Sequence, residues 1–553
     1  MTSLFDCATA QWNSNASVNT AICTATNAQR DIRIVSDQAG GAIIAWEDLR
    51  TDNITSDIYV QRVDANGFVL WTTNGISAVA IAGSTETGLR MIEDGQGGAI
   101  LVWNDSRNGN YDIFAQRINN NGAALWSFNG TAVVVKSSSQ SSPVLTPNGN
   151  GGAIVVWQDS SAGNWDIYAQ NIDSSGILLW NSNGIAVCTA PGDQINPRIV
   201  SDASLGAVFV WQDKRSGTDY SIYAQRVNDA GTGQWVANGI AVCSVAGTQN
   251  NPKIETDGNG HFVVAWPDKR NGTDYNVYAQ ALNLSGVVQW TVNGITVCSA
   301  AGNQTALDLI ADTTGIFISW KDSRSGANTN IYMQRLNWAG ATQWAANGIG
   351  VVVNAFNQVN PNLVPDGMGG TFVVWQDDRN GTANNDVYSQ RINTTGTLLW
   401  SAAGIATGSA ANDQLSPKQI NDGFGNMIAA WHDNRNATDY NIYAQKVLAS
   451  GSFPTAIESP ALPAQPATVY PDPFSESALI TWHTLTPGRI GRKQQLELTV
   501  YDVNNNQVIR TSVTGENQVT VERGHLSPGI YFFQVCPVNE NKILSKGKFI
   551  ISE

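Results

Sequence analysis

The chain has 553 residues, a net charge of −14 at neutral pH and a pI near 4.7. That length exceeds one ordinary core, so we expect two domains, or one large repeat domain and a small one. Only 14 % of the residues are charged, while 52 are Gly and 19 are Trp, which favours an all-β protein with many short strands. The acidic balance argues against nucleic acid, since phosphates need clustered Lys and Arg.

Two further absences bear on location. No run of 18 apolar residues is present, so we expect no transmembrane segment. The opening stretch "MTSLFDCATAQW" lacks a basic segment followed by an apolar one, so a signal peptide is not expected in the printed chain. The protein is therefore either cytosolic, or its printed sequence begins after processing.

A repeat organises most of the chain. A Trp stands two residues before an Asp at eight positions, spaced by 54 to 57 residues, and such a period indicates a solenoid or a propeller. One period contains four strand-like segments, which in the fifth unit are 251–257, 261–266, 276–283 and 287–298. Four antiparallel strands make one propeller blade. The eight Trp are Trp46, Trp103, Trp157, Trp211, Trp266, Trp320, Trp375 and Trp431.

The two ends of the repeat region complement each other. The last unit stops after three strands, while residues 10–23, "AQWNSNASVNTAIC", match the fourth-strand stretch 233–243, "GQWVANGIAVC". We therefore predict an eight-bladed β-propeller over residues 1–452, closed by an N-terminal strand that completes the last blade. This arrangement resembles the closure of WD40-type propellers, and it removes the free edges that an open array exposes.

The first candidate set consists of the Asp that stands two residues after each repeated Trp. The phrase around it, as in "WQDKRSGTDYSIYAQR" at 211–226, resembles the repeats of TolB-like propellers. Each Asp can cap free loop amides, and the Arg two residues later can pair with it or lie on an aromatic ring; Ser161 replaces that Arg once. Alternatively, the set forms a repeated shallow ligand site or holds calcium, although no calcium-loop motif occurs. The eight are Asp48, Asp105, Asp159, Asp213, Asp268, Asp322, Asp377 and Asp433.

A second set stands eight residues before the Asp or Asn that ends each first strand. These side chains are expected to ring the channel mouth, on an amide-rich and acidic face. They either tie the blades together or form a polar rim that binds sugar hydroxyls or a partner's backbone. The set comprises Gln29, Glu86, Gln140, Gln194, Gln249, Gln304, Gln358 and Gln414.

Catalytic and metal signatures are weak. The four His lie scattered, and no nucleophile elbow, zincin motif or phosphate-binding loop occurs, so we expect neither an enzyme nor a cofactor. A propeller glycosidase or lyase would need carboxylates that break the repeat. Cys23, Cys188, Cys243 and Cys298 end equivalent segments, so we expect unpaired, buried thiols and no metal site.

The last part of the chain differs in composition. Residues 453–467 are rich in Pro and Ala and predict an extended linker. Residues 468–553 carry eight acids and eight bases, and alternating segments broken by turns predict a small β-sandwich. Four ordered motifs, "VYPDPFSESALITW", "LELTVYDVNNNQVIR", "HLSPGIYFFQV" and "ILSKGKFII", resemble the type A C-terminal sorting domain of the type IX secretion system. One departure is Asp472, where that family commonly has Asn.

This resemblance implies an export route. Its motif residues correspond to Pro471, Pro473, Tyr501, Gly529, Tyr531, Gly547 and Lys548. Such proteins cross the outer membrane through the type IX translocon, which recognises the tail, and the cargo is secreted or attached to the cell surface. The signal peptide is then expected to be missing from the printed chain. A terminal immunoglobulin-like module without an export role is the alternative.

Together these features predict an exported, non-catalytic binding protein, an adhesin or lectin-like propeller for glycans or matrix. A structural or protein-interaction scaffold on the cell surface is the first alternative, and a propeller hydrolase or lyase is the second.

Overall fold

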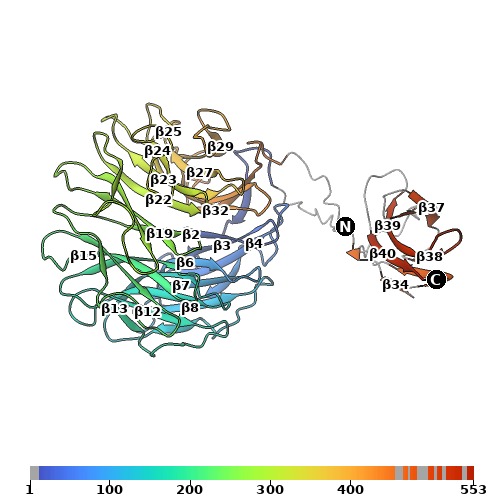
Figure 1. Cartoon of the computed structure of the whole chain (residues 1–553), viewed down its shortest axis with the longest axis horizontal. Helices are drawn as coiled ribbons and strands as arrows, with labels where there is room; N and C mark the ends of the chain where they lie inside the picture. The colour runs from blue at the N-terminus through green and yellow to red at the C-terminus, as the bar shows by residue number, and fades with distance from the viewer. Residues whose placement is uncertain are drawn as a thin grey trace. The chain divides into compact units, whose positions relative to one another are not determined.

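The computed structural model describes residues 12–454, 465–466, 468–470, 474–481, 496–502, 507–513, 518–537 and 545–552. The regular structure in these ranges is β-strand, and none of it is a helix able to cross a membrane. The chain divides into two compact units, Met1–Thr455 and Ala456–Glu553, each described here by itself (Figure 1).

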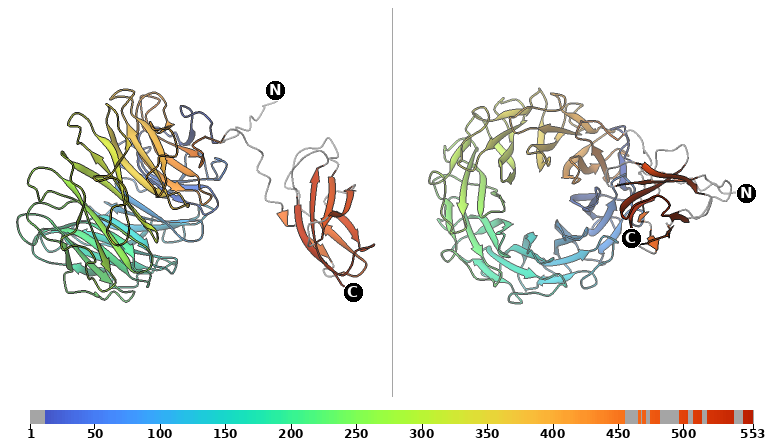
Figure 2. Two further views of the ribbon diagram at one scale, coloured as in Figure 1. Left: turned by 45° about the horizontal axis from the view of Figure 1, so that its top comes forward. Right: turned by 45° about the vertical axis from the view of Figure 1, so that its right-hand side comes forward.

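The first unit is a ring of eight four-stranded antiparallel sheets (Figure 2), which confirms the predicted eight-bladed propeller. The first strand of each blade lies innermost, where it contacts the first strands of its neighbours. These first strands are β2 (Gln29–Ser36), β6 (Glu86–Glu93), β10 (Gln140–Pro147), β14 (Gln194–Ser201), β18 (Lys253–Thr256), β22 (Gln304–Asp312), β26 (Gln358–Pro365) and β30 (Gln414–Asn421).

The second strands are buried on both faces, because each blade packs against a neighbour on either side. In the first blade all seven residues of this strand, "AIIAWED", are buried. The second strands are β3 (Ala42–Asp48), β7 (Ala99–Asp105), β11 (Ala153–Asp159), β15 (Ala207–Asp213), β19 (His261–Asp268), β23 (Gly315–Asp322), β27 (Thr371–Asp377) and β31 (Met427–Asp433).

The outer half of each blade consists of a longer third strand and a short fourth strand. The third strands are β4 (Asp57–Val63), β8 (Asp112–Ile118), β12 (Asp166–Ile172), β16 (Ser221–Val227), β20 (Asn276–Asn283), β24 (Asn330–Leu336), β28 (Asp386–Ile392) and β32 (Asn441–Val447). The fourth strands of the first seven blades are β5 (Ile76–Val79), β9 (Thr131–Val134), β13 (Ile185–Cys188), β17 (Ile240–Cys243), β21 (Ile295–Cys298), β25 (Ile349–Val352) and β29 (Ile405–Gly408).

The eighth blade takes its fourth strand from the other end of the unit, as predicted. Strand β1 (Thr20–Cys23) pairs antiparallel with β32, with Thr20 opposite Ala444. The preceding Trp12 is buried, and its indole N–H donates to the carbonyl of Ala65 at 2.9 Å. The first and last parts of the unit therefore share one sheet and one apolar core.

The four predicted thiols are buried and unpaired. Burial raises the pKa of Cys23, Cys188 and Cys243 to about 12, and that of Cys298 to about 11. They fill space between blades and remain protonated at neutral pH.

The second unit contains two small sheets that share one core around Phe533 and Phe549. The larger sheet has the order β33-β40-β39-β36-β37 and the smaller one the order β34-β35-β38. Their strands are β33 (Gln465–Pro466), β34 (Thr468–Tyr470), β35 (Ser477–Thr481), β36 (Leu496–Tyr501), β37 (Gln507–Val513), β38 (Gln518–Glu522), β39 (Gly529–Pro537) and β40 (Ser545–Ile551).

Candidate functional site

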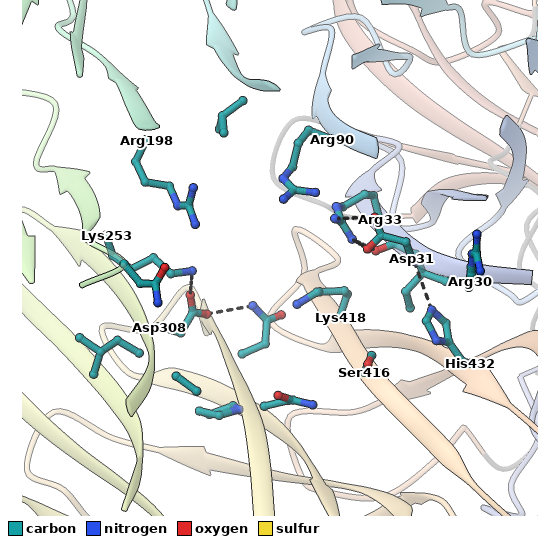
Figure 3. Close-up of a pocket in the computed structure, with 18 of the residues that line it drawn as sticks. Arg30, Asp31, Arg33, Arg90, Arg198, Lys253, Asp308, Ser416, Lys418 and His432 are labelled. Atoms are coloured by element: carbon teal, nitrogen blue, oxygen red, sulfur yellow. Dashed lines mark hydrogen bonds and ion pairs between the residues drawn. The ribbon is translucent and has the colours of Figure 1, made fainter. Parts of the chain in front are cut away.

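A cavity of about 700 Å³ lies at the centre of the propeller, lined mainly by the first strands (Figure 3). A local feature of these strands sets which side chains reach it. The second residue after the conserved Gln or Glu has a positive φ in all eight blades, as in Asp31 (49°) and Gly88 (66°). The pairing with the second strand shifts at this point, for example between Arg30 and Arg33. This bulge bends the strand and changes the direction in which the following side chains point.

The bulge brings one equivalent residue from every blade to the cavity wall, four residues after the Gln or Glu. Five of these eight residues are cations and one is a carboxylate, so their formal charge is 5 − 1 = +4. The eight, here called the channel ring, are Arg33, Arg90, Val144, Arg198, Lys253, Asp308, Asn362 and Lys418.

Two cations of the channel ring have acidic partners. Arg33 donates to both carboxylate oxygens of Asp31, at 2.8 and 3.1 Å. The ammonium of Lys253 lies 3.3 Å from Asp308, which also accepts from Asn362 at 2.9 Å. Both carboxylates are therefore already engaged by neighbouring donors.

The other three cations point into the same cavity without an acidic partner. Arg90, Arg198 and Lys418 are half-buried, and no ion pair between described residues includes any of them. Burial, together with the charge of Arg33, lowers the pKa of Arg90 to about 10 and that of Lys418 to about 8. Arg33 and Arg198 therefore repel Arg90, and Arg33 and Lys253 repel Lys418, in a partly desolvated space.

Two ionisable groups beside the ring also break the repeat. His432 accepts a hydrogen bond at Nε2 from the backbone N–H of Ile32 at 3.3 Å, and burial lowers its pKa to about 4. It is therefore neutral at pH 7. Burial, together with the charge of Asp308, raises the pKa of Glu255 to about 8.

The predicted Asp set lies away from this cavity. All eight carboxylates are fully buried, and each accepts from the indole N–H of its Trp, at 2.7 to 3.5 Å. Each also accepts from the backbone N–H two residues later, at 2.8 to 3.0 Å. In seven blades the Arg at that position stacks 3.6 to 3.8 Å from an aromatic ring. A direct ligand contact by these Asp stays a prediction, which their burial does not support.

The third blade replaces the missing Arg in a way that sequence reasoning did not foresee. Lys136, from the connection that precedes this blade, lies 2.7 Å from Asp159 and 4.3 Å above the Tyr168 ring. Burial opposes ionisation of Asp159, but hydrogen bonds from Lys136 and Ser161 hold its pKa below the ordinary value. The third blade thus has a cation in the place that Arg occupies in the other seven blades, but this cation comes from a different position in the sequence.

The predicted Gln set is buried as well, and none of its members lines the cavity. Each Gln donates from Nε2 to the carbonyl two residues earlier, within the connection between blades, as Gln140 does to Ser138 at 2.8 Å. Their proposed role in ligand binding stays a prediction. The expected acidic, amide-rich loop face stays a prediction as well. The central cavity itself is lined by the basic channel ring.

The sequence alone does not mark the channel ring. The position four residues after the Gln or Glu changes from blade to blade, but the first and second positions after the Gln or Glu change as well. Sequence patterns alone therefore assign no site role to these cations or to His432. Among the described residues, no cluster of three or more His, Cys, Asp or Glu is placed to hold a metal ion.

In the second unit, the described motif residues serve the sandwich. The Tyr531 hydroxyl donates to the carbonyl of Ser527 at 2.9 Å, and Tyr501 accepts from Gln534 at 2.8 Å. Gly529 begins β39, while Gly547 and Lys548 lie on β40 opposite Phe533 and Phe532. Pro471 and Pro473 lie outside the described residues.

Comparison with known families identifies the tail. Residues 468–552 match the family described as the secretion system C-terminal sorting domain. This match confirms the predicted sorting domain of the type IX system, with which the tail interacts. The protein is accordingly secreted or attached at the cell surface. No curated protein matches the sequence.

Several solved structures resemble the chain at low identity. A puromycin-hydrolyzing peptidase of Mycobacterium tuberculosis is 10 % identical with a TM-score of 0.40, over 76 % of this chain and 61 % of that one. A polysaccharide lyase is 10 % identical with a TM-score of 0.40, over 69 % and 92 %. An α-L-arabinofuranosidase of Fusarium graminearum is 10 % identical with a TM-score of 0.34, over 66 % and 94 %. Likeness at this level assigns no activity to this chain.

Proposed function

We propose that this chain is an exported, non-catalytic binding protein, an adhesin or lectin-like propeller that takes its ligand into the central cavity. One observation carries the proposal. The eight Asp of the blade framework are identical, whereas the eight equivalent residues of the channel ring are of five types, Arg, Lys, Asp, Asn and Val. A position that only stabilises a blade is expected to repeat. A varied ring gives the cavity an asymmetric surface that one ligand can match.

Asp31 and Asp308, the two acids that line the cavity, are already bound by neighbouring side chains, and this supports a non-catalytic role. General acid–base work needs a carboxyl group that can reach the reacting bond and exchange a proton. Asp31 is held by Arg33, and Asp308 by Lys253 and Asn362. Neither acid projects alone into the cavity.

A hydrolase or lyase is the second candidate, and a specific observation favours it. Asp31, Asp308 and His432 break the repeat, and all three line the same cavity. An increase in reducing ends or unsaturated sugars when the chain is incubated with glycans would replace the binding proposal with this one.

The decisive test is a glycan and matrix-protein array probed with the full chain, with and without calcium. The matched variants are Val144→Trp, which fills the cavity without changing charge, and Val236→Trp, at a position that is 63 % exposed and does not line the cavity. We expect saturable binding that Val144→Trp removes and Val236→Trp retains. Binding that survives Val144→Trp would place the ligand elsewhere, and if the bound spots are proteins, it would favour a surface scaffold.

A further inference from the structure

The distribution of charge in the propeller is uneven. Residues 1–452 contain 36 acids and 23 Lys or Arg, a formal charge of 23 − 36 = −13. The channel ring nevertheless carries a formal charge of +4 within one cavity. A partly enclosed site lined by one sign of charge concentrates ligands of the opposite sign.

The two unpaired arginines are held in place while most of their donors stay free. Arg90 donates one Nη1 hydrogen bond to the carbonyl of Leu89 at 2.7 Å, and Arg198 makes the same contact with Pro197 at 2.8 Å. Among the described residues, Nε and Nη2 of either side chain make no further hydrogen bond. A guanidinium fixed in this way presents a planar pair of donors that suits a carboxylate, sulfate or phosphate.

Lys418 completes the arrangement. Figure 3 shows its side chain directed toward the space that Arg90 and Arg198 also face. Asp31 acts on Arg90, and Asp31 and Asp308 act on Lys418, through space. Neither carboxylate forms an ion pair with these cations, because Asp31 is bound to Arg33 and Asp308 to Lys253. Like charges of the channel ring act on Arg90 and on Lys418 in this half-buried space, which destabilises the empty propeller. An oxyanion bound to these cations would relieve the repulsion.

The surroundings limit the size of the ligand. A cavity of about 700 Å³ is within the usual range for small-molecule sites. A long polyanion lying across the propeller would meet its net negative charge, whereas a compact group that enters the cavity meets mainly the basic ring.

Resting on the proposed function, we propose that the ligand presents an anionic group, a carboxylate, sulfate or phosphate, to Arg90, Arg198 and Lys418. An acidic sugar at the end of a glycan chain supplies such a group, and so does a small free anion. The experiment below separates these two sources.

The test is calorimetric titration of the full chain with a trimer of galacturonic acid, with a neutral trimer of galactose and with sodium sulfate. The variants are Arg90→Gln, Arg198→Gln and Lys418→Gln. The matched control is Lys214→Gln, which removes a cation outside the cavity. We expect the acidic trimer to bind at least tenfold more tightly than the neutral one, and each cavity variant to lose about tenfold in affinity. Lys214→Gln should remain within twofold of the wild type.

A second readout separates binding from a structural role. If the three cations serve a ligand, their neutral variants keep or raise the thermal unfolding midpoint, because the repulsion falls. Sulfate that binds as tightly as the acidic trimer, through the same cations, would assign the site to a free anion. Equal binding of both trimers, unaffected by the three variants, would overturn the anionic inference while the cavity remains the binding site. Failure of all three probes would also overturn it, and the array with Val144→Trp would then decide separately whether the cavity binds anything.

Discussion

At the scale of single residues, Glu86 occupies a position where seven blades have Gln. Burial raises its pKa from the ordinary 4.5 to about 8, so the folded chain keeps this carboxyl protonated where the unfolded chain ionises it. The resulting contribution to stability is complete below about pH 4.5 and is lost as the pH rises through about 8. The propeller therefore carries a buried acid whose stabilising contribution falls between about pH 4.5 and pH 8.

We predict that Glu86→Gln removes this pH dependence. The variant should match the wild type near pH 4.5 and exceed its free energy of unfolding at pH 9 by about 1–3 kcal/mol, because no buried charge then forms. Denaturant unfolding at the two pH values measures the difference. Gln140→Glu is the mirror control and should introduce the same dependence in the third blade. Identical pH profiles for wild type and Glu86→Gln would contradict the prediction.

At the scale of elements, the segment 12–23, which ends in the closing strand β1, places Trp12, Ile22 and Cys23 in the core. We predict that deleting residues 1–23 lowers the free energy of unfolding by about 2–5 kcal/mol or more, because the eighth blade loses a strand and these buried side chains. Thermal unfolding of the full chain and of the deletion gives the measurement. Deleting residues 1–11 alone controls for the shortened end. An unchanged midpoint without β1 would refute its closing role.

The sequence predicted the ring and its closure because both depend on spacing. The eight Trp-x-Asp units fix the number of blades, and the incomplete last unit required the segment around Trp12. The roles of Asp48 in capping and of Arg50 in stacking could also be predicted from the sequence, because both contacts join residues that are close in the chain. The role of Lys136 could not be predicted from the sequence, because its contact with Asp159 joins residues from two neighbouring blades.

The channel ring could not be assigned from spacing alone. Alternation along a regular strand would place the Gln and the residue four positions later on the same face. The positive φ after Arg30, Thr87 and their equivalents breaks this alternation, and the residues that adopt it include Asp, Ser, Asn and Ala as well as Gly. A bulge without a fixed residue type leaves little trace in a single sequence, so the basic cavity emerged only from the structure.

At the scale of the whole molecule, the chain divides into two compact units, one with the central cavity and one with the export tail. The tail has balanced charges, and it matches the sorting domain over 468–552, whereas the propeller holds the cavity. Each unit has its own apolar core. Removal of the tail should therefore affect delivery and leave the propeller folded.

We predict that a chain truncated after residue 467 stays inside cells that have a type IX system, while its propeller unfolds at the wild-type temperature. Immunoblots of cell and medium fractions, with thermal unfolding of the purified chain, provide the measurement. A reporter fused to residues 468–553 is the positive control and should be exported. Wild-type amounts of truncated protein on the cell surface or in the medium would refute the role of the tail.

The pairing of β1 with β32 also bears on survival outside the cell. Because the first and last strands of the propeller meet within one blade, the ring has no terminal blade from which it can unravel. A protease that cuts one connection between blades would create two new ends elsewhere, while the original ends remain joined through the eighth sheet. The nicked protein would then be a circular permutant held together without a covalent link, and such rearrangements are tolerated best at exposed loops. The closure is thus expected to let the propeller keep its fold after a single cut in one exposed connection between blades.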